Sequence, residues 1–173
     1  MSRVDASGDG PRPDVTAVVA ELTRRGETVA VAESLTGGLV VARLVDVPGA
    51  SAVVRGGIVA YATELKASLL GVDAALLARV GAVDPAVAAE MAEGVRRRLG
   101  ATWGVATTGV AGPDPQDGHA PGTAYVAVAG PERPTEVAAL APPYPAGRAA
   151  IRAATADEAL SLLARRIGVG EFG

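Results

Sequence analysis

Residues 29–44 read VAVAESLTGGLVVARL, and this stretch decides the fold. It begins with four apolar residues, as a buried strand does, breaks at residues 33–38 and continues with apolar residues at helical spacing. The pattern predicts a strand that turns sharply into a helix. N–H groups point outward at a helix start, where the dipole favours negative charge, and two glycines let a ligand approach the backbone. The turn is therefore a candidate ligand site, in which Ser34 is either a helix cap or a nucleophile.

Strands and helices alternate on either side of this turn. Apolar periodicity and the residues that interrupt it predict helices at 14–25, 39–45, 63–70, 73–80, 84–99 and 145–167, and strands at 27–32, 53–61, 102–108, 123–129 and 135–140. The alternation favours parallel pairing of the first three strands, and a turn at residues 130–134 makes the last two a hairpin. We expect an α/β fold, a three-layer α/β/α sandwich around a mixed five-stranded sheet with one antiparallel strand.

Composition bounds the class of protein. With 173 residues, 49% of them hydrophobic, and a net charge of -3, the chain can bury a full core and carries no footprint for nucleic acid. Residues 1–13, rich in Gly, Pro, Ser and Asp, predict a disordered leader, and residues 14–173 a single domain. The sequence lacks both a long apolar run and a secretory signal pattern. We therefore expect no membrane partner and a cytoplasmic location.

Three residue counts narrow the chemistry. The sequence has no Cys, one His (His119) and one Lys (Lys66), against 15 arginines. A thiol nucleophile, a disulfide and a zinc site built from several histidines are therefore excluded. A single lysine in a chain rich in arginine suggests a task for an amine that can lose its proton, although composition bias alone explains it about equally well.

Three loops meet at one edge of the predicted sheet. The loops 33–38, 61–66 and 107–113 follow the first three strands, and the carboxyl ends of parallel strands lie at the same edge. Ligands of α/β sheets bind beyond that edge. We therefore expect the functional site where these loops converge.

Ser34 at this edge needs a base to become a nucleophile. Lys66 lies in a neighbouring loop and, partly buried near a helix N-terminus, would act as a neutral base. His119 would have to be delivered by a loop rich in Pro, Gly and Asp, and the side chain of Glu33 points away from its neighbour. The alternative is that Ser34 or Thr36 only caps the helix.

Other residues of these loops have two interpretations each. Tyr61 either relays a proton and orients the lysine, or is a half-buried strand aromatic. An oxyanion would be stabilised by the amides of Gly37 and Gly38, or by those of Thr108 and Gly109.

Charged residues near the predicted edge also leave two interpretations. Glu33 holds either a ligand hydroxyl or only the helix N-terminus. Arg148 and Arg152, one turn apart on the last predicted helix, either bind a phosphate or are ordinary surface arginines. Spacing alone favours the surface interpretation for both arginines.

Four motifs, in order along residues 14–168, resemble the CinA C-terminal domain family: Val31-Ala32-Glu33-Ser34-x-Thr36-Gly37-Gly38, Asp46-x-Pro48-Gly49-x-Ser51, Gly56-x-x-x-x-Tyr61-x-x-x-x-Lys66-x-x-x-Leu70-Gly71-Val72 and Thr108-Gly109-x-Ala111-Gly112-Pro113. That family includes stand-alone nicotinamide-nucleotide amidohydrolases. The resemblance implies a three-layer sandwich, and hydrolysis of nicotinamide mononucleotide to nicotinic acid mononucleotide and ammonia, in pyridine nucleotide recycling. It implies no metal or other cofactor, and a homodimer.

The same resemblance assigns roles to residues. It makes Ser34 the nucleophile, Lys66 the catalytic lysine and Tyr61 the assisting tyrosine. The substrate-binding set that we expect comprises Glu33, Thr36, Gly37, Gly38, Thr108, Gly109, Ala111, Gly112 and Arg148. The sequence departs from the family at Leu35, where Cys is frequent, and in the loop after Pro113, which here reads DPQDGH. The alternative function is a catalytically weak nucleotide-binding module of the same family, associated with competence or damage.

Overall fold

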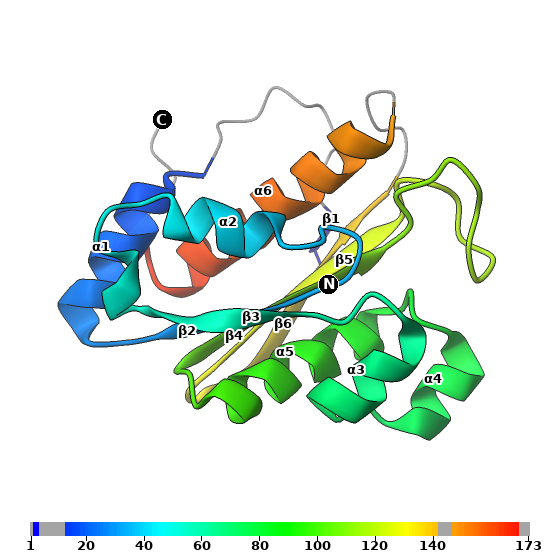
Figure 1. The fold of residues 1–173 in the computed structure, drawn as a ribbon, viewed down its shortest axis with the longest axis horizontal. Helices are drawn as coiled ribbons and strands as arrows, with labels where there is room; N and C mark the ends of the chain where they lie inside the picture. Colours follow the sequence, from blue (N-terminus) through cyan, green and yellow to red (C-terminus); the bar gives the residue numbers. More distant parts are fainter. Residues whose placement is uncertain (1, 4–12, 142–146, 170–173) are drawn as a thin grey trace.

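The structure, a computed structural model, describes residues 2–3, 13–141 and 147–169. Within these residues a central sheet has helices on both faces (Figure 1). The strands are β1 (Ser2–Arg3), β2 (Val29–Glu33), β3 (Val54–Val59), β4 (Trp103–Gly109), β5 (Ala124–Gly130) and β6 (Arg133–Leu140), and the helices are α1 (Val15–Arg25), α2 (Leu39–Val45), α3 (Thr63–Leu70), α4 (Ala74–Val80), α5 (Pro85–Leu99) and α6 (Arg148–Arg166), with a short 3-10 helix at Ala50–Ala52.

The sheet has the strand order β1-β6-β5-β4-β2-β3. Strand β2 is parallel to β3 and β4, whereas β5 is antiparallel to both β4 and β6. The predicted three-layer α/β/α sandwich, with a mixed sheet of five strands and one antiparallel strand, is therefore confirmed. The carboxyl ends of β2, β3 and β4 point to one edge, which is the arrangement on which the predicted site depends.

The structure adds a short strand to the five predicted ones. Ser2–Arg3 pairs in parallel with Ala138 and Ala139 of β6, where the sequence predicts a disordered leader. An outer strand offers a row of unpaired backbone groups, so even two residues can add to it. Residues 1 and 4–12 of the predicted leader lie outside the described residues, as do residues 145 and 146 of the last predicted helix.

The predicted five-residue turn at 130–134 is wrong. Gly130 pairs directly with Arg133, so the hairpin turn consists of two residues, and Pro134 belongs to β6. Glu132 takes up the tight turn with a φ of 63°. A proline cannot donate to a ladder, but it is tolerated near the start of a strand, where its missing N–H costs little.

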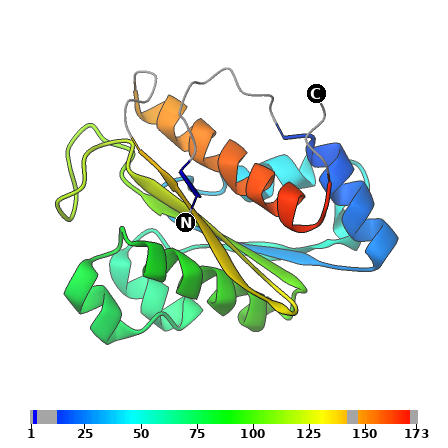
Figure 2. The ribbon, with the colours of Figure 1, turned by 180° about the vertical axis from the view of Figure 1, so that it is seen from behind.

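The two faces of the sheet bury different side chains. In β2 successive residues point to opposite faces, so Val29 and Val31 pack with α1, α2 and α6, and Ala30 and Ala32 with the helices α3 to α5. The two groups of helices lie on opposite sides of the sheet in Figures 1 and 2. Small residues on the second face allow close packing: a Cβ on Gly104 would lie 2.1 Å from the carbonyl oxygen of Ala92 in α5.

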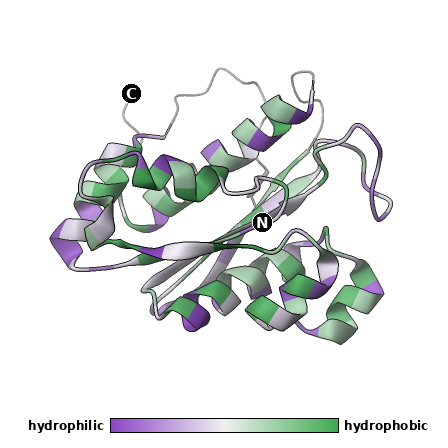
Figure 3. Ribbon diagram, in the orientation of Figure 1, coloured by the Kyte–Doolittle hydropathy of each residue, from purple (hydrophilic) through white to green (hydrophobic). Residues whose placement is uncertain are grey.

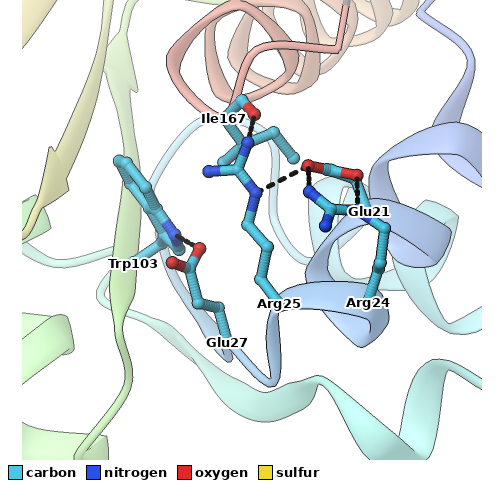
Figure 4. Close-up of polar contacts among 6 residues, drawn as sticks. All are labelled: Glu21, Arg24, Arg25, Glu27, Trp103 and Ile167. Atoms are coloured by element: carbon cyan, nitrogen blue, oxygen red, sulfur yellow. Dashed lines mark hydrogen bonds and ion pairs between the residues drawn. The ribbon is translucent and has the colours of Figure 1, made fainter.

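The amino ends of the parallel strands are closed by polar contacts (Figure 4). The indole N–H of Trp103 donates to Glu27 Oε2 at 2.7 Å. The guanidinium of Arg25, at the end of α1, donates to the carbonyl of Ile167 at the end of α6. It also donates at 2.6 Å to Glu21, one turn earlier in α1. The hydropathy colouring of Figure 3 shows that the loop between β4 and β5, at the opposite edge, is predominantly hydrophilic. This loop follows β4 at the carboxyl edge, where the sequence predicts the site.

Helix α3 packs against α5 at a glycine, and we predict that Gly94→Ala destabilises the fold. A Cβ at Gly94 would lie 1.9 Å from the carbonyl oxygen of Leu70, the last residue of α3. Overpacking of this kind costs about 1–3 kcal/mol, more than the roughly 1 kcal/mol that alanine gains over glycine in an open helix. Chemical denaturation should show a lower free energy of unfolding; a higher one would contradict this close approach of α3 to α5.

Candidate active site

Glu33, the last residue of β2, closes the start of α2. Its side chain is 1% exposed, and its carboxylate accepts the N–H groups of Gly38 (2.9 Å), Val40 (3.2 Å) and Val41 (2.9 Å). The helix N-terminus that the sequence offers to a ligand is thus occupied by the protein's own carboxylate. Of the two interpretations of Glu33, the contacts favour the one in which it holds the helix.

The glycines of the turn are also engaged within the protein. The N–H of Gly37 donates to the carbonyl of Ser34 at 3.1 Å, and that of Gly38 to Glu33. Both have positive φ, 60° and 102°, which explains why glycines stand here. Neither lines the cavity described below. The interpretation of their amides as oxyanion donors is therefore wrong, because both N–H groups already have acceptors.

Two buried threonines brace the turn against β4. The hydroxyls of Thr36 and Thr107 lie 2.7 Å apart, and both residues are fully buried. The N–H of Ser34 donates to the carbonyl oxygen of Thr107 at 3.1 Å. Thr36 does not line the cavity, so its described contacts position the turn next to Ser34.

Ser34 and Lys66 come together at the carboxyl edge of the sheet. Lys66, from the middle of α3, has no exposed surface, and its Nζ donates to Ser34 Oγ at 3.1 Å and to the carbonyl oxygen of Ala60 at 2.8 Å. Ser34 is 8% exposed. The distance between the two side chains meets the requirement that a base lies within hydrogen-bond reach of the proton it takes.

Burial changes the acidity of this lysine. Removal of the ammonium from water lowers the pKa of Lys66 from 10.5 to about 8, against the opposing effect of the carboxylates of Asp117 and Glu64. A much larger fraction of Lys66 is thus neutral near pH 8 than for an exposed lysine. When it is neutral, one N–H can still donate to Ala60 while the lone pair accepts the hydroxyl proton of Ser34.

A cavity of about 580 Å³ opens onto these two residues. Of the residues predicted for the site, its walls include Ser34, Tyr61, Lys66, Thr108, Gly109, Ala111, Gly112 and Arg148. The hydroxyl of Thr108 donates to the carbonyl of Ala82 at 2.6 Å, which fixes the end of β4 against the loop between α4 and α5. The structure thus brings together eight predicted site residues and leaves Glu33, Thr36, Gly37 and Gly38 behind the cavity wall.

Tyr61 and Arg148 form the outer side of the cavity. Arg148, the first residue of α6, donates to the phenol oxygen of Tyr61 at 2.8 Å and to the carbonyl of Gly112 at 2.7 Å. Tyr61 is 58% exposed, and in the described part of the chain its hydroxyl has no hydrogen bond to Ser34 or Lys66. The role of Tyr61 in proton transfer therefore stays a prediction, and its observed partner is the arginine.

Arg152 has a position that spacing alone does not reveal. Its guanidinium donates to the carbonyls of Leu35 at 2.9 Å and Thr36 at 2.8 Å, so it holds the two residues that follow Ser34. The one signal in the sequence that Arg152 belongs to the site is its position one helical turn after Arg148. Of the two arginines only Arg148 lines the cavity.

The other candidate bases do not reach Ser34. The carboxylate of Glu33 is directed to the amides of α2, and His119 belongs to a tight turn with Gln116 and does not line the cavity. Among the residues that the structure describes, no group of three or more His, Cys, Asp or Glu side chains is arranged to hold a metal ion. No helix in the described segments is long and apolar enough to cross a membrane.

We predict that Glu33→Ala lowers the free energy of unfolding by about 3 kcal/mol, because it leaves buried N–H groups of α2 without an acceptor. Glu21→Ala is the matched control, since Glu21 pairs with Arg24 and Arg25 at the surface, where such pairs are worth up to about 1 kcal/mol. Urea denaturation measures both variants. Equal losses would contradict the role assigned to Glu33.

We also predict that Lys66 titrates near pH 8 in the folded protein and near 10.5 after unfolding. Lys66 is the only lysine, so carbon-13-labelled lysine gives one side-chain NMR signal to follow against pH. Because burial disfavours the ammonium, the folded midpoint lies below the unfolded one. A folded midpoint near 10.5 would show that water reaches the amine freely.

Sequence and structure comparisons agree on the family. The model of the CinA C-terminal domain family matches residues 13–167. A CinA-like protein of Frankia casuarinae is 63% identical over 115 residues, which are 66% of this chain and 27% of that protein. A CinA-like protein of Anaeromyxobacter dehalogenans is 50% identical over 162 residues, 93% of this chain and 38% of that protein. The chain thus spans well under half the length of these curated relatives.

Solved structures match over almost their whole length. A CinA superfamily protein from Klebsiella pneumoniae has a TM-score of 0.83 at 30% identity, with coverage of 89% of this chain and 95% of that one. A competence/damage inducible protein from Agrobacterium tumefaciens has a TM-score of 0.82 at 32% identity, covering 92% and 99%. With the matching family model and the shared fold, these similarities show that the chain belongs to the CinA C-terminal domain family.

Proposed function

We propose that the protein is an amidohydrolase that converts nicotinamide mononucleotide to nicotinic acid mononucleotide and ammonia. The observation that carries the proposal is the contact of Lys66 Nζ with Ser34 Oγ, 3.1 Å long and buried at the base of a cavity. A serine beside an amine of lowered pKa supports nucleophilic attack on an acyl carbon. The family resemblance supplies the substrate, a carboxamide on a pyridine nucleotide.

The first half of the reaction forms an acyl-enzyme. The neutral amine of Lys66 takes the hydroxyl proton as Ser34 Oγ attacks the carboxamide carbon, and the carbonyl π electrons move to the oxygen. When the tetrahedral intermediate collapses, the C–N bond breaks and the Lys66 ammonium returns the proton to the leaving nitrogen, which departs as ammonia. The carbonyl of Ala60 holds the amine in place through both protonation states.

The second half hydrolyses the ester. A water molecule attacks the acyl carbon, Lys66 takes its proton, and the proton passes to Ser34 Oγ as the C–O bond breaks. The acid product leaves and both side chains return to their starting states. Lys66 thus acts as base and as acid in each half, which suits a group with a pKa of about 8.

The developing oxyanion needs N–H donors. We propose the amide of Leu35, next to Ser34 in the turn, because no hydrogen bond joins it to another described residue and Leu35 lines the cavity. The carbonyl of Ser34, in the same peptide plane as this N–H, accepts the N–H of Gly37 at 3.1 Å, which fixes the direction of the amide. The Leu35 amide thus takes the role that the sequence suggests for the Gly37 and Gly38 amides, which donate to other acceptors.

The outer part of the cavity suits the nucleotide. The loop at residues 108–113 forms one wall, and Arg148 places a cation near its rim, where a phosphate would meet it. The cytoplasmic location and the homodimer stay proposals that rest on the sequence and the family resemblance. Val45 at the end of α2 and Val59 at the end of the outer strand β3 are large exposed apolar side chains.

Ammonia release from nicotinamide mononucleotide tests the proposal. We predict turnover by the wild type, and a loss of at least about 10³-fold in kcat for Ser34→Ala and Lys66→Arg, because each removes a group that acts only in the chemical steps. Ser68→Ala is the matched control: it lies on α3, is exposed and does not line the cavity, so its rate should equal that of the wild type.

Two outcomes would contradict the proposal in different ways. Equal rates in the wild type, Ser34→Ala and Lys66→Arg would exclude the mechanism. Absence of ammonia release by the wild type, with nucleotide binding intact by calorimetry, would favour the catalytically weak nucleotide-binding module.

A further inference from the structure

The tip of the loop between β4 and β5 has a defined shape that the proposed mechanism does not use. Gln116 and His119 exchange two backbone hydrogen bonds of 3.1 and 2.8 Å across Asp117 and Gly118. The φ angles of Asp117 (52°) and Gly118 (78°) are both positive, which is the geometry of a two-residue hairpin turn that Asp-Gly favours. The segment Gln116–His119 is therefore a small hairpin rather than an unstructured excursion.

Asp117 docks this hairpin on the loop between α4 and α5. Its Oδ2 accepts the N–H of Ala82 at 3.0 Å, in the loop between α4 and α5. The carboxylate fits there because the preceding residue is Gly81: a Cβ at that position would lie 2.7 Å from the same oxygen. This hydrogen bond joins residues 35 positions apart in the chain, so Asp117 fixes the loop between β4 and β5 against the loop between α4 and α5.

The docking point connects directly to the cavity wall. The carbonyl of Ala82 accepts the hydroxyl of Thr108, and Ala82, Thr108 and Gln116 all line the cavity. The contacts therefore run from the end of β4, through Ala82, to the hairpin. Loss of the Asp117 contact would release one wall of the cavity without touching Ser34 or Lys66.

The charge of Asp117 also reaches the lysine. Its carboxylate favours the ammonium form of Lys66 and raises the pKa of that group, more strongly than does Glu64 on the same helix as the lysine. The ionisable residues that line the cavity besides Lys66 are Tyr61, Glu64, Asp114 and Arg148, whereas Asp117 lies outside its lining.

We propose that Asp117 is a positioning residue of the amidohydrolase: through Ala82 it holds the Gln116–His119 hairpin, of which Gln116 lines the substrate cavity, and it supplies a negative charge that acts on Lys66. The inference rests on the proposed function and extends it to the loop between β4 and β5. Asp117 acts through Ala82 and through its field, and it has no described contact with Ser34 or Lys66.

Two substitutions separate the two roles. Asp117→Asn keeps an oxygen that can accept the Ala82 N–H but removes the charge, so KM for nicotinamide mononucleotide should stay within about threefold of the wild type while the Lys66 midpoint moves to lower pH. Asp117→Ala removes both, so KM should rise about tenfold, the value of one charge-assisted hydrogen bond, and the midpoint should move in the same direction. The acidic limb of the pH–rate profile should follow the Lys66 midpoint.

Asp114→Asn is the matched control, because it removes the same charge from the same loop. Its Lys66 midpoint should move less than that of Asp117→Asn, since Asp114 is not among the charges that act on the lysine. An unchanged midpoint in Asp117→Asn, or an unchanged KM in Asp117→Ala, would overturn the proposal. The lysine NMR titration needs no turnover, so it decides the effect of the Asp117 charge even if the wild type releases no ammonia.

Discussion

Lys66 brings an amine into the protein interior, and two oxygen atoms from neighbouring segments receive it. One is the hydroxyl of Ser34, just beyond β2, and the other is the carbonyl of Ala60, just beyond β3. Without such partners a buried amine would cost several kcal/mol. The requirement to satisfy it fixes α3 against the ends of two adjacent strands. An arginine could supply the same donors but could not release a proton, so the single lysine of the chain is the residue on which a base at this position depends.

The turn that presents Ser34 is stabilised from inside the protein. Helix starts commonly bind anions, yet here the carboxylate of Glu33 occupies the first amides of α2. Arg152 holds the carbonyls of Leu35 and Thr36 from the other side. The turn is thus fixed by one anion on its amides and one cation on its carbonyls. A turn held in this way keeps its geometry when charge develops at Ser34, which is the condition for electrostatic stabilisation of a transition state.

The topology explains what the sequence could predict. Parallel strands send their carboxyl ends to one edge, so the turn with Ser34 and the start of α3, which carries Lys66, lie at the same edge. The directions of long polar side chains could not be predicted in the same way, because each side chain has several possible hydrogen-bond partners. The carboxylate of Glu33 accepts amides of α2 and does not line the cavity. Tyr61 accepts a hydrogen bond from Arg148, 87 positions away in the chain. The docking of Asp117 on Ala82 depends in addition on a turn geometry and on the space left by Gly81.

A group that takes and returns a proton in each catalytic cycle needs a pKa at which both its protonated and its neutral forms are accessible. Burial alone would lower the pKa of Lys66 further, and an amine of lower pKa is a weaker base for the serine proton. The carboxylates of Asp117 and Glu64 oppose that effect, and the balance leaves its pKa at about 8. In the proposed reaction, burial has the larger effect and makes the ammonium acidic enough to return the proton, while the two carboxylates keep the amine basic enough to take it.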